Sequence, residues 1–203
     1  MNHIGKLFIV SAPSGTGKTS LCNELLKQYP DLIYSISYTT REPRSNEIDG
    51  KDYFFVSEDK FQEMIKADEF IEWAEVHGNY YGTPKKFIED NLSSGINILL
   101  DIDPQGARQL RKKLDFGIYI FIVAPSLKDL KERLMKRKTE SEDRIRLRLE
   151  NAKKEIHFYK NYDYIVVNKN FSKAYRELES IYIAEHLKAE DVKKIEDLIK
   201  LED

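Results

Sequence analysis

Short apolar runs alternate along the chain with longer segments in which apolar residues recur at helical spacing. The runs have the length of strands and are rich in branched and aromatic side chains, and they cover residues 7–10, 32–36, 96–102, 118–123 and 164–167. Segments with one charged face separate most of them. This alternation predicts an α/β fold in which helices cover both faces of a parallel sheet.

Residues 37–83 interrupt the alternation. They contain the sequence Arg41-Glu-Pro-Arg44, a turn signal at Asp49-Gly50, the strand-like residues 53–56 and a short helix expected to open at Ser57. The pattern predicts a mostly β insertion in a parallel-sheet protein.

Two later segments carry helix signals. The first has Thr83 as its candidate N-cap, Pro84 at the first helical position and Gly95 past its end. The second, residues 189–203, alternates acidic and basic residues around spaced apolar ones, which is typical of a solvated helix packed on one side. We expect a scaffold role for this last helix.

Length and charge narrow the class of protein. A chain of 203 residues suits one domain with inserted subdomains and is long enough to bury a substantial core. A net charge of −2 and a pI near 6.2 argue against a general nucleic-acid or membrane-surface role. No apolar stretch approaches the length of a transmembrane helix, and the first strand is expected almost directly after the N-terminus, without a signal peptide.

Cysteine and histidine usage adds little chemistry. The single cysteine, Cys22, cannot form an internal disulfide, and its place in the first predicted helix favours a small buried apolar side chain. A reducing cytoplasm fits this usage. The four histidines show no ligand spacing with Cys22 or with one another, which argues against a zinc site.

The first strand leads into the sequence Ala12-Pro-Ser-Gly-Thr-Gly-Lys18-Thr19, and a helix-like segment follows. In such a loop Gly15 and Gly17 let backbone N–H groups turn toward phosphates, Lys18 reaches the terminal phosphates, and the Thr19 hydroxyl meets Mg²⁺. The strict pattern begins with glycine; Ala12 has the next smallest side chain. The loop therefore predicts a nucleoside triphosphate as ligand.

Two arginines in the insertion indicate a second phosphate site. Arg41 and Arg44 are three residues apart, beside a proline that prevents the chain from continuing as a helix. Two fixed guanidinium groups can hold one phosphate from two sides.

Together with the phosphate loop, five further blocks of the sequence resemble guanylate kinases. The set follows the order of that family from about residue 5 to about residue 170. The blocks are Ser37-Tyr-Thr-Thr-Arg41-Glu-Pro-Arg44, Gly50-Lys-Asp-Tyr53-Phe, Glu69-Phe-Ile-Glu72-Trp, Asn79-Tyr-Tyr-Gly-Thr83 and Leu100-Asp101-Ile-Asp103-Pro-Gln-Gly106.

The resemblance implies phosphoryl transfer from ATP to GMP, and to dGMP, giving ADP and the nucleoside diphosphate. It also implies three parts in one domain: a parallel-sheet core (about residues 1–36, 84–127 and 160–203), a β-rich GMP-binding insertion (about 37–83) and a helical lid (about 128–159). The small-molecule partners would be ATP with Mg²⁺, and GMP. The oligomeric state stays open.

Physical chemistry supports a guanine-reading role for Glu72. Guanine shows N–H donors at N1 and N2, so one carboxylate can accept two hydrogen bonds from guanine and none of that kind from adenine. By resemblance Ser37 and Thr83 bond the base, while four residues hold the GMP phosphate: Arg41, Arg44, Tyr53 and Tyr81. The alternatives are a solvated carboxylate for Glu72 and strand packing for the tyrosines.

Asp101 and Asp103 follow a buried strand and should lie at its carboxyl end, where ligands bind to parallel sheets. One carboxylate could hold Mg²⁺ and the other could touch the acceptor nucleotide. We assign Asp101 to the GMP site and Asp103, with Thr19, to the metal, although the sequence leaves this division open. The alternative for Asp103 is to cap the helix that starts near Pro104.

Residues 128–154 hold eleven Lys and Arg against six Asp and Glu, in a chain that is slightly acidic overall. By resemblance Arg133, Arg137 and Arg148 belong to a lid that closes over the ATP phosphates. Arg144 and Arg146 could equally belong to a solvated helix. Lys138 stands where the family commonly has glycine, and it would stiffen the hinge or add a phosphate contact.

The expected roles divide as follows. Asn168, at the end of the last strand, matches an asparagine near the adenine, with a strand-end turn residue as the alternative. The expected catalytic residues are Lys18, Arg41, Arg137 and Arg148, and the expected ATP-binding residues are Ser14, Gly15, Thr16, Gly17, Lys18, Thr19, Ser20, Arg133, Arg137 and Asn168.

The expected transfer is in line, without a covalent intermediate, and needs no strong base because the acceptor phosphate is already ionised. Three other functions fit the sequence less well. A catalytically inactive interaction module would have an eroded phosphate loop, and a kinase for another acceptor would lack the block around Glu72 and Thr83. An RNA-binding role would need an aromatic platform beside the basic cluster.

Overall fold

The apolar runs of the sequence become the strands of the central sheet. The structure, a computed structural model, describes residues 5–76, 78–136 and 142–188. Its strands are β1 (Leu7–Ser11), β2 (Leu32–Tyr34), β3 (Tyr38–Thr39), β4 (Phe54–Phe55), β5 (Phe70–Val76), β6 (Asn79–Pro84), β7 (Asn97–Ile102), β8 (Ile118–Val123) and β9 (Tyr164–Val167). Its helices are α1 (Lys18–Gln28), α2 (Glu58–Lys66), α3 (Lys85–Ser93), α4 (Pro104–Lys113), α5 (Leu127–Lys136), α6 (Glu142–Glu155), the 3₁₀ helix η1 (Ile156–Asn161) and α7 (Phe171–His186).

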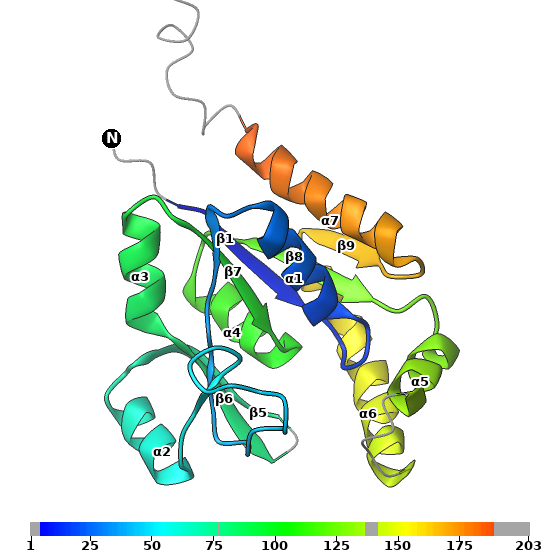
Figure 1. Ribbon diagram of the computed structural model, residues 1–203, viewed down its shortest axis with the longest axis horizontal. Helices are drawn as coiled ribbons and strands as arrows, with labels where there is room; N and C mark the ends of the chain where they lie inside the picture. The colour runs from blue at the N-terminus through cyan, green and yellow to red at the C-terminus, as the bar shows by residue number, and fades with distance from the viewer. Residues whose placement is uncertain (1–4, 77, 137–141, 189–203) are drawn as a thin grey trace, which may run out of the picture.

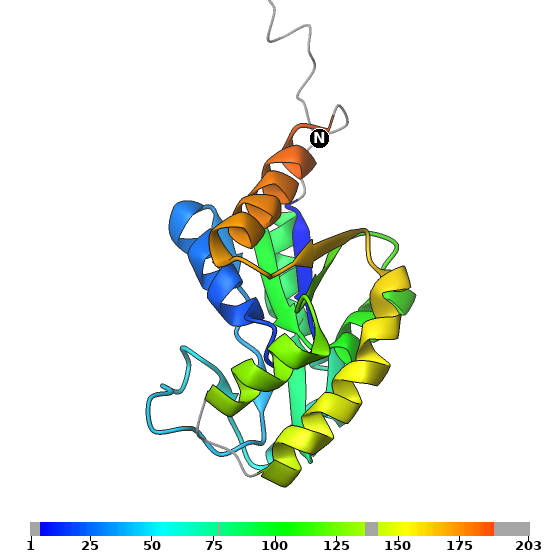
Figure 2. The same ribbon diagram turned by 90° about the vertical axis from the view of Figure 1, so that its right-hand side faces the viewer.

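Within the described residues, five strands form a parallel sheet in the order β2-β7-β1-β8-β9. Helices α1 and α7 cover one face and α3 and α4 the other (Figures 1 and 2). The predicted α/β fold is therefore confirmed. Because β1 and β7 are parallel, with Val10 opposite Asp101, the loop after β1 and the carboxylates at the end of β7 lie at the same edge of the sheet.

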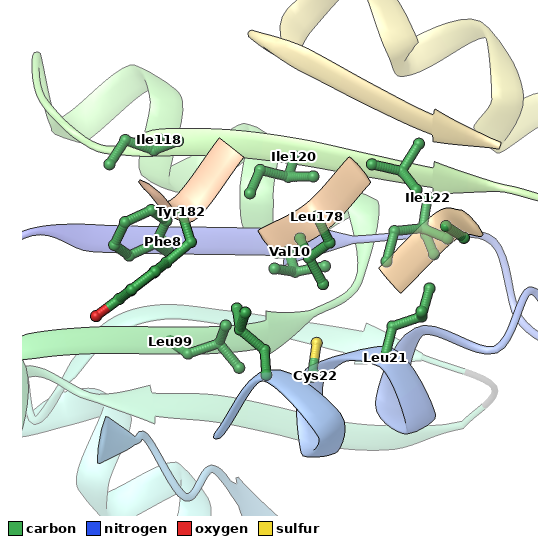
Figure 3. Close-up of a cluster of buried hydrophobic side chains, with 14 of the residues drawn as sticks. Phe8, Val10, Leu21, Cys22, Leu99, Ile118, Ile120, Ile122, Leu178 and Tyr182 are labelled. Atoms are coloured by element: carbon green, nitrogen blue, oxygen red, sulfur yellow. The ribbon is translucent and has the colours of Figure 1, made fainter. Parts of the chain in front are cut away.

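The core has one layer on each side of this sheet. Figure 3 shows the layer under α1 and α7, where Phe8 of β1 packs against Tyr182 of α7, Val10 lies beside Leu178, and Leu21 of α1 belongs to the same cluster. Cys22 lies in this layer with no exposed surface, as the sequence predicted, and burial raises the pKa of its thiol well above the ordinary value. The sheet edge at which β1 and β7 end is therefore supported by a rigid, closely packed core.

Two groups of elements extend from the central sheet beyond the carboxyl ends of β1 and β7 (Figure 1). One is a second sheet in the order β4-β3-β6-β5, with α2 packed against it through Phe61 and Met64. The other is the pair α5 and α6, joined by a small core that includes Leu130, Leu134 and Ile145. They occupy the segments expected for the insertion and the lid.

Most helix boundaries follow the sequence signals. The Ser57 side chain caps α2 by accepting a hydrogen bond from the backbone of Lys60 at 3.2 Å, and Gly95 adopts φ 80° just beyond α3. The prediction for the start of α3 was wrong: Thr83 belongs to β6, Pro84 is the N-cap and the helix begins at Lys85.

The last predicted helix, residues 189–203, lies outside the described residues. Among the helices that the structure does describe, we find none with the length and apolar character needed to span a membrane.

Candidate active site

A cavity of about 250 Å³ lies at the carboxyl edge of β1 and β7, bounded by the smaller sheet on one side and by α6 on the other. Most of the site residues expected from the sequence line it. They are Ser14, Gly15, Thr16, Gly17, Lys18, Thr19, Ser20, Ser37, Arg44, Tyr53, Glu72, Tyr81, Asp101, Asp103 and Arg148. The fold thus brings segments between residues 12 and 155 around one space.

The phosphate loop has the backbone conformation that its glycines permit. Gly15 and Gly17 have φ angles of 91° and 92°, in the left-handed region that other residues rarely adopt. Gly17 directly precedes α1, so the loop ends at a helix N-terminus, which attracts anions. A Cβ on Gly17 would lie 2.6 Å from the amide nitrogen of Asn168, so this position also lacks space for a side chain.

The next residues form a network of charges at the end of β7. The ammonium group of Lys18 lies 2.5 Å from a carboxylate oxygen of Asp101 and donates to the carbonyl of Ile102 at 2.5 Å. The Thr19 hydroxyl donates to the other Asp101 oxygen at 3.0 Å. A hydroxyl and a carboxylate this close are oxygen donors of the kind that Mg²⁺ prefers, so these residues fit the expected metal ion.

Asp103 has a different local role. Its carboxylate accepts a hydrogen bond from the backbone N–H of Gly106 at 2.8 Å and caps α4, as the alternative interpretation of the sequence had it. It also lines the cavity, so the cap leaves it accessible to a ligand. The metal assignment of Asp103 stays a prediction, and the geometry gives Asp101 the closer relation to Thr19.

Side chains from the other end of the chain hold the phosphate loop. Arg133 of α5 and Asn168 after β9 both donate to the carbonyl of Thr16, at 3.1 and 2.8 Å. Arg133 also donates to the carbonyl of Asn168 at 2.7 Å, and neither residue lines the cavity. Arg148 of α6 reaches the loop from the cavity side and donates to the Ser14 hydroxyl at 3.1 Å.

The carboxylate of Glu72 is buried at the far side of the cavity. The residue is 3% exposed, and the Thr83 hydroxyl donates a hydrogen bond to it. Burial raises the pKa of Glu72 to about 7; the Thr83 hydrogen bond opposes this rise, and the charge of Asp103 adds to it. A Cβ on Gly106 would collide with Oε2 of Glu72 and lie 3.0 Å from its Cδ, so a larger residue where α4 passes this carboxylate would displace it.

Arg41 lies beside the cavity, fixed by a partner that the sequence analysis did not identify. Its two terminal nitrogens each donate to one oxygen of Glu47 at 2.9 Å, its Nε donates to the Tyr81 hydroxyl at 3.3 Å, and its guanidinium lies 5.4 Å from the centre of the Tyr53 ring. Partial burial raises the pKa of the Glu47 carboxyl, but the hydrogen bonds from Arg41 oppose this rise, and the pKa lies below its ordinary value. Arg44 lies 3.5 Å from the same carboxylate.

Sequence reasoning also missed Glu155, which ends α6 and lines the cavity. Burial raises its pKa to about 7, and the nearby charge of Asp103 adds to the rise. One glutamate among the several acidic and basic residues of this helix gives no signal in the sequence. Two of the predicted residues, Arg137 and Lys138, lie outside the described residues.

Comparisons with known proteins agree with this geometry. A family model described as guanylate kinase matches residues 4–185. The chain is 54% identical to a guanylate kinase of Geobacter sulfurreducens over 185 residues, 91% of each chain, and 46% identical to that of Thermotoga maritima over 184 residues, 91% of this chain and 89% of the relative.

The fold is also similar to a solved structure. The crystal structure of guanylate kinase from Anaplasma phagocytophilum superposes with a TM-score of 0.78 at 34% identity, covering 98% of this chain and 95% of that one. A family match over most of the chain, with relatives of this identity and coverage, places the protein in a family of ATP-dependent GMP-phosphorylating enzymes: the chain belongs to the guanylate kinase family.

Proposed function

We propose that this protein transfers the terminal phosphoryl group of ATP to GMP or dGMP by a direct in-line reaction in the cavity described above. One observation carries the proposal: a phosphate loop and a buried carboxylate suited to guanine line the same cavity. A phosphate loop alone would fit many nucleotide enzymes. The buried Glu72 opposite it narrows the acceptor to a guanine nucleotide.

ATP would bind with its phosphates on the loop. The left-handed glycines Gly15 and Gly17 and the start of α1 present backbone N–H groups, and Lys18 supplies a positive charge at the carboxyl edge of the sheet. Arg133 and Asn168 support this site by holding the Thr16 carbonyl. Mg²⁺ bound near Thr19 and Asp101 would neutralise phosphate charge.

GMP would bind between the smaller sheet and the loop. Glu72 would accept hydrogen bonds from the guanine N1–H and N2–H groups, while Ser37 and Thr83 would complete the contacts to the base. The phosphate would be held by a cluster of guanidinium and phenol groups that the structure brings together: Arg41, Arg44, Tyr53 and Tyr81.

Transfer then requires alignment, charge neutralisation and exclusion of water. The acceptor oxygen belongs to an ionised phosphate, so no side chain has to remove a proton from it. Lys18 and Arg148 line the cavity. Lys18 would lie close to the transferred group, and Arg148, with Arg137, would close over it. Closure of the segments 37–83 and 128–159 toward each other would exclude water.

A coupled ADP-release assay tests this function. ATP and Mg²⁺ are supplied with GMP, dGMP, AMP, CMP or UMP in parallel. We expect turnover with the two guanine nucleotides only. Comparable turnover with AMP would refute the guanine-reading role, and the absence of turnover with every acceptor would refute the activity.

ATP and GMP as substrates, and the single reduced thiol, are consistent with the cytoplasm as the site of action.

A further inference from the structure

Side chains of a helix form hydrogen bonds with the edge of β5 that is not paired with another strand. Within the described residues β5 is the last strand of its sheet, paired with β6 on one side only. On its other side, residues one helical turn apart on α4 donate to alternate carbonyls of the strand. The pairs are Gln105 to Glu75 at 3.4 Å, Gln109 to Trp73 at 2.6 Å and Lys113 to Ile71 at 2.8 Å.

The spacing of these bonds follows from the two secondary structures. Residues four apart on a helix are about 6.0 Å apart along its axis, and residues two apart on a strand are about 6.6 Å apart. Carbonyls at alternate positions point to the same edge of a strand, so one face of α4 matches the row of acceptors. Gln109 bonds to Trp73 as a residue of a neighbouring strand would, because its side-chain oxygen also accepts a hydrogen bond from the Trp73 N–H at 3.5 Å.

The same helix is anchored in the central core. Ala107 and Leu110 are buried against the layer that includes Leu7 and Ile9 of β1. The N-cap of α4, Asp103, lines the cavity. Helix α4 therefore belongs to the rigid core and yet makes the edge contacts of the smaller sheet, where the two parts of the molecule meet (Figure 1).

Glu72 lies between two of the bonded residues. Ile71 and Trp73 are its chain neighbours, and each gives its carbonyl to α4. The Glu72 carboxylate itself lies against Gly106 in the first turn of that helix. We propose that Gln105, Gln109 and Lys113 are positioning residues that fix Glu72 relative to the phosphate loop; the proposal rests on the guanine-reading role of Glu72 given above.

Two variants at position 109 test the proposal. Gln109→Met keeps the side-chain length and removes the donor, whereas Gln109→Lys restores a donor of the kind that Lys113 already provides. In the Met variant we expect KM for GMP to rise about fivefold to tenfold, equivalent to one or two net hydrogen bonds. We expect kcat and KM for ATP to stay within about twofold, and the Lys variant to recover most of the loss.

A matched control is Lys112→Met, at an exposed position on the same helix. It should leave both KM values unchanged. Trp73 is the only tryptophan in the sequence and lies at the bonded edge, 36% exposed, so its fluorescence reports directly on this contact. The emission of the free protein should shift in Gln109→Met and return in Gln109→Lys.

The outcomes separate two failures. If the unaltered protein does not phosphorylate GMP, the proposed function is wrong. If it does, and Gln109→Met changes neither KM for GMP nor Trp73 emission, the positioning role is wrong. A loss that affects ATP and GMP equally, or one that Gln109→Lys leaves uncorrected, would also overturn it, because either result indicates a general effect on folding.

Discussion

The two ends of the cavity, the donor end expected to bind ATP and the acceptor end expected to bind GMP, are built differently. One is mostly a continuous segment of the chain, and the other combines several separate segments. The donor end is largely one continuous segment, residues 12–20, whose glycines permit its backbone conformation and whose Thr16 carbonyl is held by Arg133 and Asn168. The acceptor end combines Ser37, Tyr53, Glu72 and Tyr81 from separate segments, and each depends on how the smaller sheet folds. A largely continuous site should depend on few distant residues, here Asp101, Arg133, Arg148 and Asn168, whereas an assembled site should respond to many substitutions far from the ligand. The following predictions test this difference.

The largest effect is expected at the donor end. Lys18→Ala removes the ammonium group that lies 2.5 Å from Asp101 at the carboxyl edge of the sheet. We expect kcat to fall about 100- to 1,000-fold, because a charge that stabilises the transferred group is lost. GMP binding, measured by calorimetry, should change little, since the residues expected to hold the base and the phosphate of GMP lie mostly in the segment of the smaller sheet. Turnover close to that of the unaltered protein would contradict the role of Lys18.

A smaller effect is expected for base selection at the acceptor end. Glu72→Gln replaces two acceptor oxygens by one acceptor and one donor, so guanine loses one hydrogen bond and meets a competing donor. The ratio of kcat/KM for GMP to that for AMP should fall by about 10- to 100-fold, equivalent to one bidentate base contact. Unchanged discrimination would mean that another group reads the base.

The protonation state of Glu72 gives a test without changing a residue. Its pKa of about 7 means that the free protein carries much of this carboxyl in the protonated form below neutrality. Guanine N–H donors favour the charged form, so GMP affinity should increase by about tenfold between pH 6 and pH 8. The Glu72→Gln variant serves as the control and should lack this component, whereas the ionisation of the GMP phosphate affects both proteins alike.

The smallest effect concerns the contact between Gly106 and Glu72. Gly106→Ala alone should lower the thermal midpoint, because the added methyl group collides with the Glu72 carboxylate. In the Glu72→Ala background the same substitution should instead raise the midpoint by up to about 2 °C, since alanine stabilises a helix relative to glycine and Gly106 lies in the first turn of α4. Equal shifts in the two backgrounds would show that the two positions do not interact.

The sequence predicted the donor end better than the acceptor end for a physical reason. Strand length, glycine placement and helix start are local properties, so the predicted order of strand, glycine loop and helix is the order that the structure has in residues 7–28. The assignment of Thr83 as an N-cap failed because threonine before proline looks the same in sequence whether its hydroxyl caps a helix or bonds a distant carboxylate.

Long-range partners account for most of what was missed. Glu47 pairs with Arg41 across a loop, and Glu155 approaches Asp103 from another helix; neither spacing has a sequence signature. The match between α4 and β5 was not foreseen either, because Gln105 and Gln109 look like ordinary polar residues on an exposed helix face. The three-part division of the chain into core, insertion and lid, as separately moving units, stays a prediction.

The two hydrogen bonds to the Thr16 carbonyl also fix the peptide plane between Thr16 and Gly17. In a trans peptide the carbonyl oxygen and the next N–H point in opposite directions. With two donors, Arg133 and Asn168, fixing the oxygen on one side, the N–H of Gly17 is fixed on the other. Flipping this plane would break both bonds, at about 1–3 kcal/mol each. The loop therefore keeps its N–H orientation before any nucleotide arrives, and the conformational entropy of that arrangement has already been lost during folding.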